Sequence, residues 1–131
     1  MSVTYNKINA FVADQANKVH NLGSDQLTVF LTDSAPVATN ITQISYTNLS
    51  TRNLTVTAST QSSGTYKLVA NQLTLTASGA VAQFRYVGIY NSTASGGPLI
   101  AWYDYGSEVN MVNTDTFVVA LDLTNGILQT A

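Results

Sequence analysis

The 131-residue sequence contains no cysteine, so it has no disulfide bond, no thiolate metal site and no cysteine nucleophile. Charge is also scarce, because charged residues make up 9% of the chain, whereas roughly a quarter is usual in soluble domains. The five basic residues are scattered and the isoelectric point is near 4.9, which excludes nucleic-acid binding as a main function. Without a disulfide bond or a thiolate metal site, the stability of the fold must come from packing alone.

Long hydrophobic runs are missing as well. The first twenty residues are interrupted by Asn9, Asp14, Gln15 and Asn17, so we expect neither a signal peptide nor a membrane anchor. No later stretch approaches the roughly 18 apolar residues that a membrane span requires. We therefore expect a protein that is made in a cytoplasm and has no membrane partner.

The chain is nevertheless rich enough in apolar residues to fold. These make up 45% of the sequence, and the polar part consists largely of 18 Thr, 12 Ser and 12 Asn. We expect residues 1–131 to form a single domain, with an N-terminal helix at about 5–20 and a β-domain at about 24–131. A nearly uncharged surface limits the solubility of a free monomer, which favours a protein whose surface is covered by neighbours.

The only helical pattern lies near the N-terminus. Ile8, Phe11, Val12 and Val19 recur at the spacing of one helical face, and His20 followed by Asn21 and Gly23 is typical of a helix end. This apolar stripe must pack either on the protein's own sheet or on a neighbouring chain, and the short connection to the next strand favours its own sheet.

The rest of the sequence alternates between apolar and polar residues. Strands are predicted at 26–32, 54–59, 65–70, 73–78, 84–90, 99–106, 116–123 and 127–130, with a weak segment at 41–46. Asn125 and Gly126 indicate a tight turn between the last two strands. The fold class is therefore mainly β: an antiparallel β-sandwich or flattened barrel of about seven or eight short strands with one N-terminal α-helix.

The apolar phase of each alternation predicts the core. Its members are Leu27, Val29, Leu31, Leu54, Val56, Leu73, Leu75, Phe84, Tyr86, Trp102, Phe117, Val119 and Leu121.

Groups that could perform catalysis are few. His20 is the only histidine, and a polar residue at the end of a helix explains it. Asp104 and Glu108 could flank a sugar as acid and base, but paired carboxylates at a strand end are more often turn formers. Asp104, Glu108 and Asp115 lack the spacing of a calcium-binding loop. We expect no catalytic residue, no cofactor and no metal site.

Aromatic residues are concentrated in the second half of the chain. Trp102, Tyr103 and Tyr105 could stack on sugar rings, but aromatic residues on adjacent strands more often serve the core and interfaces. The candidate interface residues are Tyr5, Phe11, Trp102, Tyr103, Tyr105, Asn125 and Gly126.

Three segments resemble a family of small virion proteins of tailed bacteriophages and prophages. YNKINAFVADQANKVHNLGSDQLTVFLTDSAPVATN, residues 5–40, is similar to the opening of the family. FRYVGIYNSTASGGPLIAWYDYG, residues 84–106, and TFVVALDLTNGILQTA, residues 116–131, resemble its C-terminal half. ITQISYTNLSTRN, residues 41–53, departs from the family, whose members carry a longer, acidic and glycine-rich insertion at this place.

The resemblance implies a non-enzymatic structural component of the virion, and most plausibly a capsid decoration (cement) protein on the outer head lattice. The implied partners are the major capsid protein and further copies of the chain, for example in a trimer or another closed ring. The alternative is a tail, fibre or head–tail junction component, with a carbohydrate-binding adhesion module as one form. The composition does not distinguish capsid from tail.

Overall fold

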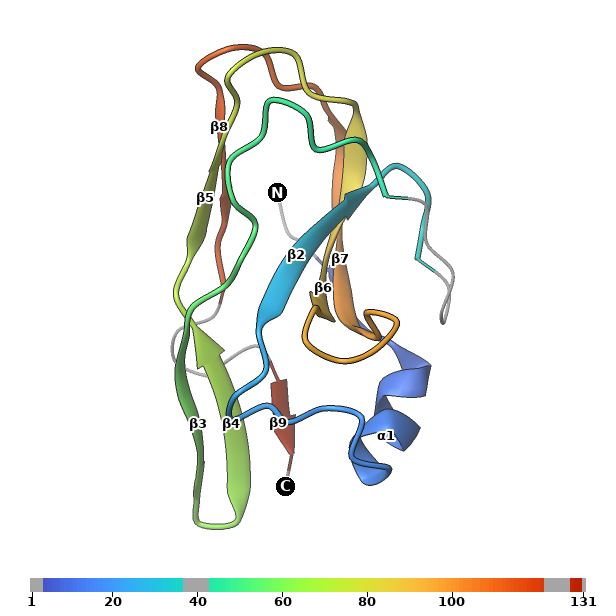
Figure 1. The fold of residues 1–131 in the computed structure, drawn as a ribbon, viewed down its shortest axis with the longest axis vertical. Coiled ribbons are helices and arrows are strands. Elements are labelled where there is room, and N and C mark those ends of the chain that lie inside the picture. The colour runs from blue at the N-terminus through green and yellow to red at the C-terminus, as the bar shows by residue number, and fades with distance from the viewer. Residues whose placement is uncertain (1–3, 37–42, 122–127, 131) are drawn as a thin grey trace.

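The computed structural model describes residues 4–36, 43–121 and 128–130. Antiparallel strands dominate the fold, and the described residues contain one short helix near the N-terminus (Figure 1), which confirms the mainly β class. The elements are β1 (Thr4–Lys7), α1 (Asn9–Ala16), β2 (Leu27–Thr32), β3 (Val56–Ser62), β4 (Thr65–Ala70), β5 (Leu73–Thr76), β6 (Phe84–Asn91), β7 (Leu99–Val109), β8 (Thr116–Val119) and β9 (Leu128–Thr130).

The largest sheet has the strand order β1-β7-β6-β2, and all neighbouring strands are antiparallel. Its centre is the β6–β7 hairpin, whose two strands correspond to the predicted strands at 84–90 and 99–106. Gly88 of β6 lies opposite Phe30 on one side and Trp102 on the other. The missing side chain of Gly88 provides the space that the Phe30 ring occupies, because a Cβ atom there would lie 2.0 Å from Phe30 Cζ.

Two smaller sheets, β3-β4-β9 and β5-β8, lie on the other side of the molecule (Figure 1). The β3–β4 hairpin closes through Ser63 and Gly64, whose φ angles of 52° and 81° are both positive, as a type I′ turn requires. In Figure 1, β5 continues the course of β4, so the two strands behave as one interrupted strand. The predicted strands at 54–59 and 65–70 are thus joined by a tight turn at Ser63 and Gly64.

The expected terminal hairpin, with strands 116–123 and 127–130, is wrong. β8 pairs with β5, where Leu73 lies opposite Val119, and β9 pairs with β4. β8 and β9 therefore bind successive parts of the same interrupted strand and run in the same direction, which is incompatible with a hairpin. The Asn125–Gly126 pair itself lies outside the described residues.

The outer edge of β2 is covered by an irregular segment, residues 43–54, where the sequence indicates only a weak strand at 41–46. The backbone bonds run from Ile44 N to Leu31 O, from Val29 N to Arg52 O and from Leu54 N to Leu27 O. Arg52 also donates from Nη1 to Val29 O at 2.6 Å, and its guanidinium lies 3.5 Å from the centre of the Tyr46 ring. All six residues of β2 are buried, on both faces.

The N-terminal segment differs from the expected helix at 5–20. Residues Thr4–Lys7 form β1 on the edge of β7, and α1 covers only Asn9–Ala16. Ile8 is extended between the two, and its N–H donates to Ile100 O. The helix ends because Lys18 adopts a left-handed conformation with a φ of 63°.

The helix packs on its own fold, as expected. Ile8 and Phe11 are buried, with 2% and 6% of their surface exposed. Val12, by contrast, is 56% exposed. Only part of the predicted apolar stripe therefore faces the core.

The predicted core is largely correct. Leu27, Val29, Leu31, Leu54, Leu75, Phe84, Val119 and Leu121 are buried, while Val56, Leu73, Trp102 and Phe117 are partly exposed and pack against the buried cluster. Tyr86 is partly exposed and contacts Trp102. The prediction misses Phe30, Val87, Ile89 and Ile100, which are all buried. The β6–β7 pairing shifts register at two places, so a single alternating phase does not describe the hairpin.

Candidate functional site

The aromatic residues of β7 do not form one platform. Trp102 and Tyr103 are consecutive on a strand and point to opposite faces of the sheet. Trp102 packs edge to face against Tyr86, with ring centres 5.6 Å apart, whereas Tyr105 packs against Phe117 at 5.3 Å. The structure therefore disperses the three rings that could stack on a sugar.

The other candidate interface residues lie in β1, in α1 and near the C-terminus. Tyr5 lies opposite Tyr103 in the β1–β7 register, and Phe11 is buried in the protein's own core. Phe11 thus does not present its side chain to a partner in this structure. Asn125 and Gly126 lie outside the described residues.

The two carboxylates that could act as acid and base are held by other side chains. Asp104 accepts two hydrogen bonds from Arg85, at 2.9 and 3.1 Å, and a third from the Gly106 N–H. The Arg85 hydrogen bonds are the main reason why the pKa of Asp104 is below its ordinary value. Glu108 accepts from Gln83 Nε2, which also donates to Asp33, and the proximity of Asp33 raises the pKa of Glu108.

A polar cluster, in which His20 and Asn91 are buried and Asp25 is partly exposed, joins the end of the helical segment to the β6–β7 hairpin. Asn91 is completely buried, and its Nδ2 donates to His20 Nδ1 at 3.0 Å and to Asp25 Oδ2 at 2.6 Å. Asn91 Oδ1 accepts from the N–H groups of Thr93 and Ala94 at 3.0 Å. We call His20, Asp25 and Asn91 the polar cluster.

The polar cluster fixes the protonation state of His20. Because His20 Nδ1 accepts a hydrogen bond, its proton resides on Nε2, which is buried without a hydrogen-bond partner and lies 4.0 Å from Asp14 Oδ2. Burial lowers the pKa of His20, and the nearby Asp14 and Asp25 carboxylates only partly oppose this effect. His20 is therefore a neutral structural residue, and it lies four residues beyond the last residue of α1, Ala16, rather than at the helix end where the sequence places it.

This arrangement predicts a pH-dependent stability. The unfolded chain takes up a proton at His20 near pH 6.5, while the folded protein does not, so the free energy of unfolding is expected to fall as the pH decreases below about 6.5. Above that value the contribution of His20 is complete and constant. Urea denaturation at a series of pH values measures the slope.

Two variants isolate the contribution of His20. His20→Gln removes the titrating ring and is expected to flatten the slope between about pH 6.5 and 5. Glu108 acts in the opposite direction, because its raised pKa stabilises the folded state as the pH falls, and Glu108→Gln removes that contribution. If the free energy of unfolding still falls with decreasing pH in His20→Gln, the pH dependence does not arise from His20.

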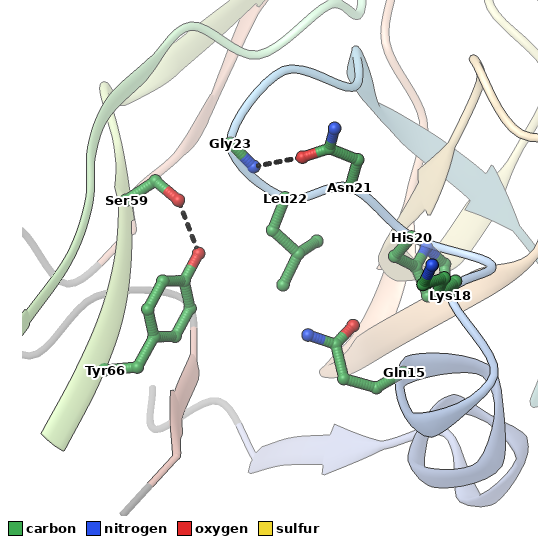
Figure 2. A pocket seen from close by; sticks show the side chains of 8 residues that line it. All are labelled: Gln15, Lys18, His20, Asn21, Leu22, Gly23, Ser59 and Tyr66. Carbon is green, nitrogen blue, oxygen red and sulfur yellow. Dashed lines mark hydrogen bonds between the residues drawn. The ribbon is translucent and has the colours of Figure 1, made fainter. Parts of the chain in front are cut away.

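A hollow of about 520 Å³ lies between the end of the helical segment and the β3–β4 hairpin (Figure 2). Its lining residues are Gln15, Lys18, His20, Asn21, Leu22, Gly23, Ser59 and Tyr66. The Tyr66 and Ser59 hydroxyls lie 2.6 Å apart on one wall, and on the other the Gly23 N–H donates to Asn21 Oδ1. Its described lining residues include no carboxylate.

The sequence offers one overlooked signal for the polar cluster. Asn91 begins the triplet Asn-Ser-Thr at the start of a loop, and an asparagine there commonly accepts hydrogen bonds from N–H groups two or three residues ahead. His20 and Asp25 carry no comparable signal, because the long-range contact with Asn91 gives them their roles.

Neither metal ligands nor a membrane span emerge in the described part of the chain. There, no three histidine, aspartate or glutamate side chains gather closely enough to hold a metal ion. Within the same residues, no helix has the length and apolar character needed to cross a membrane. Comparisons with protein-family models, with curated proteins and with solved structures found no match.

Proposed function

We propose that this protein is a non-enzymatic structural component of a tailed-bacteriophage virion and that it decorates the outer lattice of the head. The likeness of residues 5–40, 84–106 and 116–131 to small virion proteins carries the proposal. On this view the protein is made in the cytoplasm of the host and binds the major capsid protein, together with further copies of itself. Its role is to stabilise the assembled head.

The exposed surface supports a role in assembly. Thr57 and Thr60 of β3 and Thr74 and Thr76 of β5 are exposed and uncharged. Such a surface can be covered by a neighbouring protein without removing charges from water, a step that is costly when the charge stays unpaired. The two carboxylates considered as acid and base also support a non-enzymatic role, because both are held by other side chains. Asp104 accepts a hydrogen bond from Arg85, and Glu108 accepts one from Gln83.

Binding to phage heads tests the proposal. Purified protein added to heads that lack it is expected to bind until a fixed stoichiometry is reached, one that matches positions of the capsid lattice. The decorated heads are expected to withstand heating better than the bare heads, because a ligand that binds only the assembled state stabilises it. Sedimentation with quantitative gel analysis measures the first result, and release of the packaged DNA on heating measures the second.

Isolated tails and tail-free heads serve as matched samples in the same experiment. Binding to tails alone, or no binding to heads, contradicts the decoration role and favours a tail or fibre component. A carbohydrate-binding module of the kind expected from Trp102, Tyr103 and Tyr105 loses support, since Trp102 and Tyr103 point to opposite faces of β7 and Tyr105 packs against Phe117.

A further inference from the structure

The outer edge of β3 is open in the described structure. The sheet order β3-β4-β9 places β3 at an edge, and its only strand partner among the described residues is β4. Ser62 and Thr65 flank the two-residue turn and therefore form the hydrogen-bonded pair next to it. By alternation, Gln61 and Ser59 direct their backbone N–H and C=O groups away from β4, toward the open edge.

Within the residues that the structure describes, this edge lacks the usual protection against pairing with another strand. Proteins protect edges with charges, proline, short strands or a covering segment. β1 has four residues and ends in Lys7, the outer edge of β2 is covered by residues 43–54, and β8 and β9 have four and three residues. β3 has seven residues, VTASTQS, with neither charge nor proline, and its one irregularity lies at its start, between Val56 and Ala58.

We propose that a second copy of this chain pairs with β3, antiparallel and about a twofold axis, to join the two β3-β4-β9 sheets into one continuous sheet. An antiparallel edge is complementary to itself under a twofold rotation, because each residue contacts its counterpart reciprocally. With Thr60 on the axis, Gln61 of each protomer exchanges both backbone hydrogen bonds with Ser59 of the other. The two Thr60 side chains then lie opposite one another, a favourable cross-strand pair.

The charges near this edge favour a second copy as the occupant. β3 itself carries no charge, so self-pairing brings no like charges into direct contact. The nearest cation in the hairpin register is Lys67, opposite Thr60 on β4. Its counterpart in the second protomer would lie three strand spacings away, about 14 Å, which exceeds the screening length of roughly 8 Å at physiological salt.

A substitution at Gln61 tests the pairing through the backbone. Gln61→Pro removes the N–H that points to the open edge and leaves the β4-facing groups in place, and proline is tolerated on that side of an edge strand. Gln61→Ala is the matched control, because it also loses the side-chain bond to the Gly64 N–H but keeps the backbone N–H. Sedimentation velocity is expected to show a concentration-dependent dimer for the original protein and for Gln61→Ala. For Gln61→Pro, dimerisation is expected to weaken at least about tenfold.

A second variant keeps the test decisive if Gln61→Pro fails to fold. Thr60→Lys places two like charges opposite one another across the axis and is expected to give a monomer at low salt whose dimerisation recovers as salt is added. Thr60→Gln is its uncharged control. A protein that remains monomeric at all concentrations, or an oligomer that Gln61→Pro and Thr60→Lys both leave intact, overturns the proposal.

The inference specifies the surface for the self-association included in the proposed function. Its test uses only the purified chain and no phage heads, so the two proposals can fail separately. A dimer that does not bind heads supports the pairing and contradicts the decoration role, whereas a monomer that binds heads does the opposite.

Discussion

Gly88→Ala is expected to lower the free energy of unfolding by about 3 kcal/mol or more, the upper end of what overpacking of a core costs. An added Cβ atom would lie 2.0 Å from Phe30 Cζ and 2.8 Å from the backbone oxygen of Ala101. The first contact requires a buried ring to move and the second requires the β6–β7 pair to separate. Urea denaturation followed by circular dichroism measures the loss.

A double-mutant cycle shows whether the Phe30 ring is the cause. Phe30→Ala alone is expected to cost about 3–5 kcal/mol, because it leaves a cavity in the core. In the Phe30→Ala/Gly88→Ala protein, the added methyl group enters that cavity, so the loss is expected to be clearly smaller than the sum of the two single losses. Additive losses would place the strain at the Ala101 oxygen alone. A Gly88→Ala protein as stable as the original would contradict the tight contact itself.

The hairpin at 84–106 is predictable because the residues that specify it are neighbours in the sequence. The two strands flank a loop of turn-forming residues, and neighbouring segments of this kind pair readily. The N-terminal segment shows the opposite case. Residues 5–7 fall within the predicted helix at 5–20, yet Thr4–Lys7 pairs with residues 101–104, which are distant along the chain. Tertiary pairing overrides local periodicity there, and no sequence window contains both partners.

The prediction of a terminal hairpin is wrong for a related reason. The Asn-Gly pair at 125–126 is a strong hairpin signal, but β4 and β5 together offer a longer partner to β8 and β9. The polar cluster could not be predicted from local sequence patterns either, since it joins residue 20 to residue 91. By contrast, the low charge, the absent cysteine and the mainly β class follow from composition and alternation alone.

Asn91→Leu is expected to destabilise the protein by about 3 kcal/mol or more, since each buried polar group left without a partner costs about 1–3 kcal/mol. Leucine has nearly the same shape but provides no hydrogen bond to His20, Asp25, Thr93 or Ala94. Thermal unfolding compares this variant with Asn113→Leu at an exposed asparagine, where we expect a change within about 0.5 kcal/mol. Equal losses at the two positions would contradict a structural role for the polar cluster.

Asn91→Asp separates the loss of donors from the loss of acceptors. The introduced carboxylate can still accept from Thr93 and Ala94, but it can no longer donate to His20 or Asp25. A negative charge beside His20 Nδ1 favours the protonated ring and raises the pKa of His20 in the folded state. The introduced carboxylate also lies beside the Asp25 carboxylate, and both neighbours favour proton uptake by the folded protein, so the loss of stability at falling pH is expected to become smaller than in the original protein or to turn into a gain. An unchanged slope in Asn91→Asp would mean that Asn91 does not control the protonation of His20.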